Sequence, residues 1–370
     1  MSLFHKIMLK SVLYNLATDT CNGFFPGAAK LVLLPASFLY GLCIRVIRGF
    51  RLSSSKRLPC AVVSVGNITL GGTGKTMIVE CVSRYLHAQG NNVAVLSRGY
   101  KRSGGGTGVS RMDNDPAGSC ADIGDEPYML AKKLPGIPVL VDENRIRAAY
   151  RAHGTYAADT VVLDDGFQQW GIHKDLEIVA LNSEKPFGNM HMIPRGILRE
   201  PVSSLRRADV FIITKVSPGR KTESLRKFLS SMNPSAEIVE SDHVAEAIFR
   251  FADCGDCVPL DSLRGKSAVV FSGIGDPSSF EDLLTRLGIR IAKSFLFDDH
   301  HQYTKEEMVR VIENAKGLKV DYVVTTEKDA ARLSVLPEKE TRGVWVLRIK
   351  LNIHTNEEGL YRRLRRIRPA

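Results

Sequence analysis

The chain has 370 residues, enough for two domains that each bury a hydrophobic core. Its composition, 44% hydrophobic and 25% charged, excludes a disordered, collagen-like or coiled-coil protein. The formal net charge of +11 indicates an anionic partner, and the lack of a zinc finger, basic zipper or RNP stretch in the sequence disfavours nucleic acid. Seven cysteines, an odd and scattered set, indicate a reducing compartment rather than a disulfide framework.

The most apolar segment lies near the amino terminus, at residues 31–44. It is shorter than the roughly 20 residues of a membrane-spanning helix, it contains Pro35, and no small-residue cleavage site follows it. Two interpretations fit it equally: an interfacial segment whose basic flank meets acidic headgroups, or a buried helix packed on the rest of the protein. The flank consists of Arg45, Arg48, Arg51, Lys56 and Arg57.

An apolar strand pattern at residues 61–66 runs into a glycine-rich turn, and a helical apolar pattern follows at 77–86. The glycines allow backbone N–H groups to converge on a polyphosphate, Lys75 adds a positive charge, and the hydroxyl of Thr76 can bind Mg²⁺. Thr69 stands where the usual phosphate-binding loop has its first glycine, but the strand–turn–helix context supports the same function. The sequence therefore predicts a nucleoside triphosphate with Mg²⁺. The turn comprises Gly71, Gly72, Thr73, Gly74, Lys75 and Thr76.

Further apolar strand patterns alternate with helical stretches along the chain, which predicts an α/β fold with a P-loop NTPase-like parallel sheet core. A second series of strands and helices begins near residue 246 and predicts a second, smaller α/β domain. The predicted partition is an amino-terminal membrane-interface helical segment, a P-loop kinase core, the smaller α/β domain and a basic carboxy-terminal tail, at residues 1–58, 59–245, 246–352 and 353–370.

Several carboxylates stand where they could serve chemistry. Asp164 and Asp165 end the apolar strand pattern 161–163, and in P-loop enzymes an acidic residue at a strand end reaches Mg²⁺ directly or through water. Asp125 begins a helical stretch after Gly124. There it either caps the helix or accepts a proton from an attacking hydroxyl.

Two further segments carry polar residues without a regular period. Asp298 and Asp299 precede His300 and His301, a cluster that suits either a metal ion or the pairing of an imidazole with Asp125. Arg199 lies in a turn-rich loop, where it either offsets charge on a transferred phosphoryl group or is a solvated surface arginine.

Taken in order, these motifs resemble the tetraacyldisaccharide 4′-kinases, the lipid A kinases of Gram-negative envelopes. The resemblance runs from about residue 30 to residue 333. It is carried by Gly71-Gly72-Thr73-Gly74-Lys75-Thr76, Gly124-Asp125-Glu126-Pro127, Asp164-Asp165-Gly166-Phe167-Gln168, Gly188-Asn189, Leu198-Arg199-Glu200-Pro201, Asp299-His300-His301 and Thr325-Thr326-Glu327-Lys328-Asp329. Gln169, Met77 and Asp298 stand where the family usually has His, Pro and Pro.

The resemblance implies transfer of the γ-phosphate of ATP to the 4′-hydroxyl of a tetraacylated glucosamine disaccharide 1-phosphate, forming a lipid IVA-type precursor. It implies a peripheral, monotopic enzyme at the cytoplasmic face of the bacterial inner membrane, whose amino-terminal helix dips into the bilayer and meets its anionic surface. It also implies roles for single residues: Asp125 as catalytic base paired with His300, Thr76 with Asp164 and Asp165 at Mg²⁺, and Arg199 and Glu200 beside the phosphates and metal.

The competing interpretation is a membrane-surface ATPase with a deviant P-loop, which also lacks the first glycine. That class needs a lysine where this chain has Leu70. A GTP-binding switch would need Asn-Lys-x-Asp, which Glu327-Lys328-Asp329 does not supply.

Overall fold

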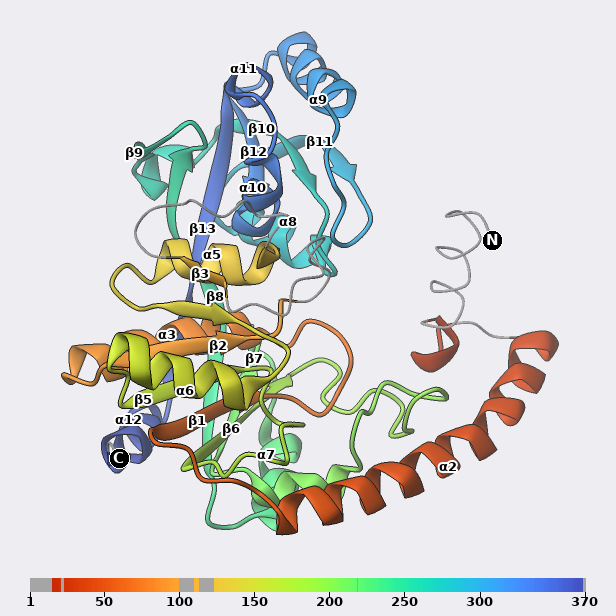
Figure 1. Ribbon diagram of the computed structural model, residues 1–370. Coiled ribbons are helices and arrows are strands. Elements are labelled where there is room, and N and C mark those ends of the chain that lie inside the picture. The colour runs from red at the N-terminus through yellow and green to blue at the C-terminus, as the bar shows by residue number, and fades with distance from the viewer. Residues whose placement is uncertain (1–14, 21–22, 100–109, 113–122, 218, 369–370) are drawn as a thin grey trace. The chain divides into compact units, whose positions relative to one another are not determined.

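The computed structural model describes residues 15–20, 23–99, 110–112, 123–217 and 219–368. Parts of the predicted segments 1–58 and 353–370 therefore lie outside the described residues. The chain divides into two compact units, each discontinuous in sequence (Figure 1). Unit 1 comprises Met1–Lys75, Asp159–Ser241 and Ile353–Ala370, and unit 2 comprises Thr76–Ala158 and Asp242–Asn352. The domain boundaries expected near residues 59, 246 and 353 stay predictions.

Unit 1 is built on a parallel sheet in the order β8-β7-β6-β1-β5. All six residues of β1 and all five of β5 and β7 are buried, because a parallel strand covered on both faces must be apolar throughout. The parallel α/β fold predicted from the alternation of patterns is confirmed. The elements of this unit are α2 (Phe24–Ser53), β1 (Ala61–Gly66), β5 (Thr160–Asp164), β6 (Leu176–Asn182), η1 (Val202–Arg207), β7 (Val210–Thr214), α7 (Glu223–Met232), the start of β8 (Glu237–Arg250) and α12 (Glu357–Arg365).

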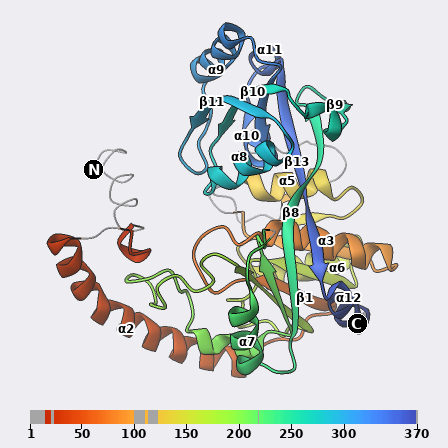
Figure 2. The ribbon, with the colours of Figure 1, turned by 180° about the vertical axis from the view of Figure 1, so that it is seen from behind.

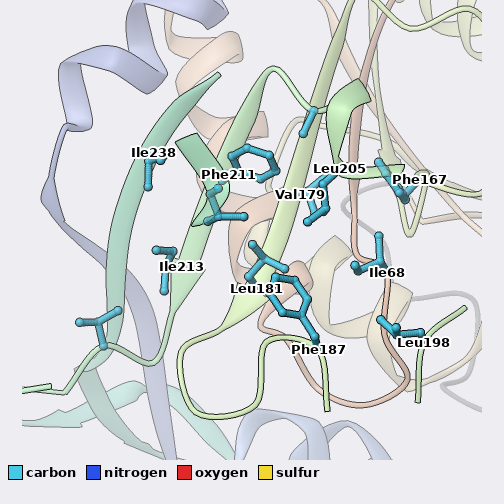
Figure 3. Close-up of a cluster of buried hydrophobic side chains, with 13 residues drawn as sticks. Ile68, Phe167, Val179, Leu181, Phe187, Leu198, Leu205, Phe211, Ile213 and Ile238 are labelled. Carbon is cyan, nitrogen blue, oxygen red and sulfur yellow. The ribbon is translucent and has the colours of Figure 1, made fainter. Parts of the chain in front are cut away.

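One core cluster of unit 1 fixes the loop that carries Arg199. Strand side chains such as Leu181 and Phe211 pack there with Phe187, Leu198 and Leu205 from the loop and the short helix η1 (Figure 3). Leu198 and Leu205 are almost fully buried, so the segment between them is held at both ends.

Unit 2 contains the parallel strands β11-β10-β12-β13, the parallel pair β2 and β4 with β3 antiparallel to β4, and β9 antiparallel to β8. Its elements are α3 (Lys75–Ala88), which starts on the last residue of unit 1, β2 (Val93–Ser97), β3 (Ser110–Met112), α5 (Asp125–Lys133), β4 (Val139–Val141), α6 (Arg145–Tyr156), β9 (Asp253–Val258), η2 (Leu260–Leu263), β10 (Ser267–Ser272), α8 (Pro277–Arg286), β11 (Arg290–Leu296), α9 (Lys305–Leu318), β12 (Tyr322–Thr326), α10 (Glu327–Leu333), α11 (Glu338–Thr341) and β13 (Val344–Thr355).

Two hydrophobic clusters cover the two faces of β10. Ala268 and Val270 face one cluster, which includes α8, and Val269 and Phe271 face the other, which includes α9, as the two-residue period of a strand requires. A smaller cluster joins Tyr128 of α5 to Ala331 of α10. This packing brings the first turn of α5 close to the residues of α10.

Helix α2 is longer than the apolar run 31–44 indicated. It extends from Phe24 to Ser53, 30 residues, with Pro35 inside it (Figures 1 and 2). By length and composition, Pro26–Ser53 is sufficient to cross a membrane, so the expectation that this segment is too short to do so was wrong. The apolar pattern continues past residue 44 through Val46, Ile47 and Phe50, with arginines between them.

Candidate active site

The phosphate-binding turn joins β1 to α3, and several local features fix its path. Gly66 packs against the chain at Phe167, where a Cβ would lie 2.5 Å from the backbone nitrogen. Gly71 and Gly74 have φ of 105° and 75°, a region that favours glycine. The hydroxyl of Thr214 donates to the carbonyl of Thr73 (3.0 Å). A Cβ on Gly72 would meet nothing within 4 Å, so space remains open beside this part of the turn.

The loop that carries Arg199 pairs with the entry to this turn. The N–H of Leu70 donates to the carbonyl of Ile197, and the N–H of Arg199 donates to the carbonyl of Ile68, both at 2.7 Å. These two hydrogen bonds place Arg199 beside the phosphate-binding turn.

Arg199 makes a bidentate contact with the carboxylate of Asp165. Nη1 donates to Oδ2 at 2.9 Å and Nη2 to Oδ1 at 2.7 Å, and Nη2 also reaches the side-chain oxygen of Asn67. The Nζ of Lys75 lies 3.5 Å from Oδ1 of Asp165. Burial opposes ionisation of Asp165, but the hydrogen bonds from Arg199 and the charge of Lys75 outweigh it and hold its pKa well below the usual range. Lys75, Asp165 and Arg199 are thus brought together, with Asn67 as a partner that the sequence did not identify.

Asp164 is the last residue of β5 and is buried; it pairs in register with Val65 of β1, the strand that enters the turn. Thr76 follows Lys75 in the first turn of α3 and is also buried. Among the residues that the structure describes, no group of three or more His, Cys, Asp or Glu side chains forms a ready metal site. The tandem histidines therefore do not form such a metal cluster.

Glu200 is fully buried, and both of its oxygens already accept hydrogen bonds. Arg207 binds them at 3.0 and 3.1 Å, while Gln168 and Trp170 donate to Oε1 at 3.1 and 3.2 Å. Burial opposes its ionisation, but the hydrogen bond from Arg207 lowers its pKa overall. Arg48 of α2 lies 3.6 Å from Oε2. Glu200 therefore anchors the loop to Arg207 and lies beside Arg48 of α2, and its contact with a metal stays a prediction.

Asp125, the first residue of α5, shares its Oδ2 between an imidazole and a guanidinium of unit 2. The Nδ1 of His300 lies 2.8 Å away, and the Nε and Nη2 of Arg332 lie at 3.0 and 2.5 Å. Burial opposes ionisation of Asp125, but His300 and Arg332 outweigh it and hold its pKa well below the usual range. Because an ionised carboxylate only accepts, Nδ1 of His300 must carry a proton.

The second imidazole has a different partner: Nε2 of His301 lies 2.9 Å from Oε2 of Glu307. Arg332 was missed by the sequence analysis. A signal existed, because Arg332 follows Asp329 by three residues on one helical face just after the Thr325–Asp329 motif.

A glycine-rich turn between a buried parallel strand and a helix, with carboxylates at the end of the adjacent strand, defines a P-loop nucleotide-binding enzyme. The model of the tetraacyldisaccharide-1-P 4′-kinase (LpxK) family matches residues 29–367. The chain belongs to this family, which decides against the membrane-surface ATPase.

Individual proteins agree with this assignment. A curated tetraacyldisaccharide 4′-kinase of Halothermothrix orenii is 36% identical over 82% of this chain and 84% of its own length. One of Anaeromyxobacter dehalogenans is 38% identical over 82% of this chain and 81% of its own length. The crystal structure of the Aquifex aeolicus LpxK in complex with ATP matches with a TM-score of 0.72 and 29% identity, over 91% of this chain and 99% of that one.

Proposed function

We propose that this enzyme transfers the γ-phosphate of ATP to the 4′-hydroxyl of a tetraacylated glucosamine disaccharide 1-phosphate, a step of lipid A biosynthesis, with Asp125 as the general base. The family assignment supports the reaction. The observation that carries the base is the contact of Asp125 with His300 and Arg332 at the start of α5.

The two oxygens of Asp125 have different surroundings. Oδ2 accepts from His300 and Arg332, whereas Oδ1 accepts from the backbone N–H of Glu126 (3.1 Å) and retains a lone pair for an incoming hydroxyl. An ionised Asp125 can take the proton of the 4′-hydroxyl at Oδ1 while the hydroxyl oxygen attacks the γ-phosphorus. The proton is thus transferred to a carboxylate that His300 and Arg332 hold in place. The bond between the γ-phosphorus and the bridging β-phosphate oxygen breaks, and ADP leaves.

The phosphate-binding turn supports the binding of ATP. Backbone N–H groups of the glycines and the first turn of α3 suit the β- and γ-phosphates, and Lys75 adds a point charge. Arg199 adjoins this turn and suits the charge on the transferred phosphoryl group.

The residues present fit Mg²⁺, which in such enzymes takes one or two carboxylates, substrate phosphates and water and needs no larger protein cluster. Asp164 and Asp165 are our candidate carboxylates, with the hydroxyl of Thr76, and Asp165 is in addition held by Arg199. When bound, the metal would neutralise charge on the phosphates.

We also propose that α2 lies in the interface of the cytoplasmic leaflet of the inner membrane rather than crossing it. One face of α2 is committed to unit 1: Ser37 donates to the carbonyl of Met192 (2.8 Å), Tyr40 to that of Arg199 (3.3 Å), and Arg48 bonds to Ser204. The opposite face carries exposed apolar side chains. These include Leu31, Val32, Phe38, Leu39, Leu42, Val46 and Phe50. A helix with one face bound to protein and the other apolar fits an interfacial position.

The test is a kinase assay with the purified full chain, ATP, Mg²⁺ and tetraacyldisaccharide 1-phosphate in detergent micelles, with the product followed by mass spectrometry. One phosphate should be added at the 4′ position. Asp125→Asn should lower kcat by roughly 10² to 10⁴ with little change in ATP affinity, because it removes a proton acceptor and no phosphate contact.

Glu126→Gln is the matched control, since its neighbouring carboxylate pairs with Lys328 instead. ATP hydrolysis without a phosphorylated lipid would sink the proposed reaction. A fully active Asp125→Asn enzyme would exclude the proposed base.

A further inference from the structure

Arg332 is the largest fully buried side chain among the described residues, and all three of its guanidinium nitrogens are engaged. Nε and Nη2 donate to Oδ2 of Asp125, and Nη1 donates to the carbonyl of Gly273 (2.7 Å) and to Oδ1 of Asp329 (2.9 Å). A charge is not buried in this way unless it is paired and hydrogen-bonded. Arg332 contacts two carboxylates, those of Asp329 and Asp125, which differ in how firmly other groups hold them.

Asp329 is the fixed partner. It is fully buried, and beyond Arg332 it accepts from the N–H of Gly273 (3.0 Å) and from the hydroxyls of Tyr303 (2.8 Å) and Thr326 (2.7 Å). Burial and the charge of Asp329 raise the pKa of Tyr303, so it remains a neutral donor. These donors come from the residue after β10, the segment before α9 and the residue that precedes α10. Its ion pair with Arg332 therefore sets where the guanidinium lies.

Asp125 is the partner that belongs to the proposed chemistry. Around it lie the cations Arg332 and Lys328 and the imidazole of His300. On the acidic side, Glu126 pairs with Lys328, and Asp299 lies 3.7 Å from the far nitrogen of His300. Among these, Arg332 alone approaches Oδ2 with two nitrogens from a fully buried position. His300 is one-fifth exposed. The rigid constraint on the carboxylate thus comes from Arg332.

We infer that Arg332 is a positioning residue for phosphoryl transfer: anchored by Asp329, it holds Oδ2 of Asp125, turns Oδ1 toward the acceptor hydroxyl and keeps the carboxylate charged. This inference rests on the proposed role of Asp125 as base. It assigns to Arg332 no contact with substrate.

The charge and the geometry can be separated by two substitutions. Arg332→Met removes both, and because the cation lowers the pKa of Asp125, its loss raises that pKa. The acid limb of the kcat/KM profile, where the base becomes protonated, should move to higher pH by about one unit or more, with kcat at neutral pH lower by about tenfold or more. Arg332→Lys keeps a positive charge but loses the guanidinium, which donates from two nitrogens to Asp125. The acid limb of its kcat/KM profile should therefore stay near that of the wild type, while kcat falls.

Arg332→Met leaves Asp329 buried without its cation and can unfold unit 2. The double variant Arg332→Met/Asp329→Asn removes one charge of each sign and leaves the net charge of the site unchanged. Its acid limb should still move to higher pH, but by less, because loss of the Asp329 charge partly offsets loss of the cation. Thermal unfolding and ATP affinity are measured for each variant, with the exposed Arg310→Met as a matched control.

A folded double variant whose acid limb and kcat match the wild type, beside an inactive Asp125→Asn enzyme, would overturn the inference alone. An active Asp125→Asn enzyme would overturn the proposed base, and the role of Arg332 with it.

Discussion

Arg199 makes two contacts that a lysine cannot make together. Its planar guanidinium holds both oxygens of Asp165 and reaches Asn67 at the entry to the phosphate-binding turn. We expect Arg199→Lys to lower kcat by about tenfold or more, because one ammonium group cannot replace the two-armed contact. Arg199→Met should lose more, since the charge is also gone. Steady-state kinetics at varied ATP concentration measures both.

Arg195 provides the matched control on the same loop. Its guanidinium pairs with Asp19 at 3.0 Å and makes no contact with Asp165 among those described. Arg195→Lys should therefore leave kcat within about twofold of the wild type. Full activity of the Arg199→Lys enzyme would show that the bidentate contact of Arg199 with Asp165 is dispensable.

Residues inside recognisable motifs could be predicted from the sequence, and residues that act through long-range contacts could not. Lys75, Asp125, Asp165 and His300 were predicted as site residues because each stands at a strand end, a helix start or a charged cluster. The structure pairs Lys75 with Asp165 and His300 with Asp125, and their catalytic roles stay predictions. Arg332 bonds to a residue 207 positions away, and no spacing rule reports such a contact. Glu200 has the right type for a metal ligand, which stays a prediction, and only the structure reveals that Arg207, Gln168 and Trp170 donate to its oxygens.

At the scale of elements, Lys133 ties together three helices and a strand of unit 2. Its Nζ lies 2.8 Å from Glu80 on α3, 3.1 Å from Glu327 on α10 and 2.9 Å from the carbonyl of Ile349 on β13. Burial raises the pKa of Glu80 in spite of this cation. Lys133→Met would leave two buried carboxylates without it. We expect a loss of about 3–5 kcal/mol in the free energy of unfolding, measured by denaturant titration.

Lys132→Met is the control, because its neighbouring ammonium is exposed and lies over the ring of Tyr128 at 4.7 Å. Its cost should stay below about 1 kcal/mol. Adding Glu80→Gln to the Lys133→Met variant should recover part of the lost stability, since one of the two buried carboxylates is then neutral. Equal stability of the two lysine variants would contradict a structural role for Lys133.

Elements buried on both faces were predicted well, and the element that faces solvent on one side was not. Strands such as β1 and β7 are continuous apolar runs, so their existence and direction follow from composition and alternation. In α2 the apolar residues after Ile44 are interspersed with Arg45, Arg48 and Arg51, so the uninterrupted apolar run ends at residue 44 although the helix does not. The helix continues because its period, not its mean composition, separates the apolar face from the basic residues.

For the whole molecule, the net charge of +11 and the apolar face of α2 favour the same location from two physical directions. Positive charge attracts the protein to an acidic surface, and this attraction weakens as salt is added. Burial of apolar side chains in the interface also favours binding, and this contribution is not screened by salt. Arg45 and Arg51 are exposed on α2, while Arg48 is turned to Ser204 and Glu200. The two contributions can therefore be altered separately.

Leu39→Glu/Val46→Glu should weaken binding to vesicles that contain anionic lipid by about tenfold or more, because both side chains are more than two-fifths exposed and their apolar contact is replaced by charge. Arg45→Gln/Arg51→Gln should bind less tightly at low salt and should show a flatter dependence on salt concentration. Cosedimentation with vesicles at two salt concentrations measures both effects. Leu318→Glu, which alters an equally exposed leucine on α9, controls for added negative charge.

Activity toward an acceptor dispersed in detergent separates membrane attachment from chemistry in the same variants. If α2 serves attachment, the Leu39→Glu/Val46→Glu enzyme keeps its kcat on micellar substrate and loses rate only when the acceptor is embedded in vesicles. Wild-type binding by this variant would instead mean that another surface meets the bilayer. If binding of the wild-type chain to anionic vesicles does not depend on salt, its positive charge does not contribute to that binding. Attraction between exposed charges must weaken as the Debye length shortens.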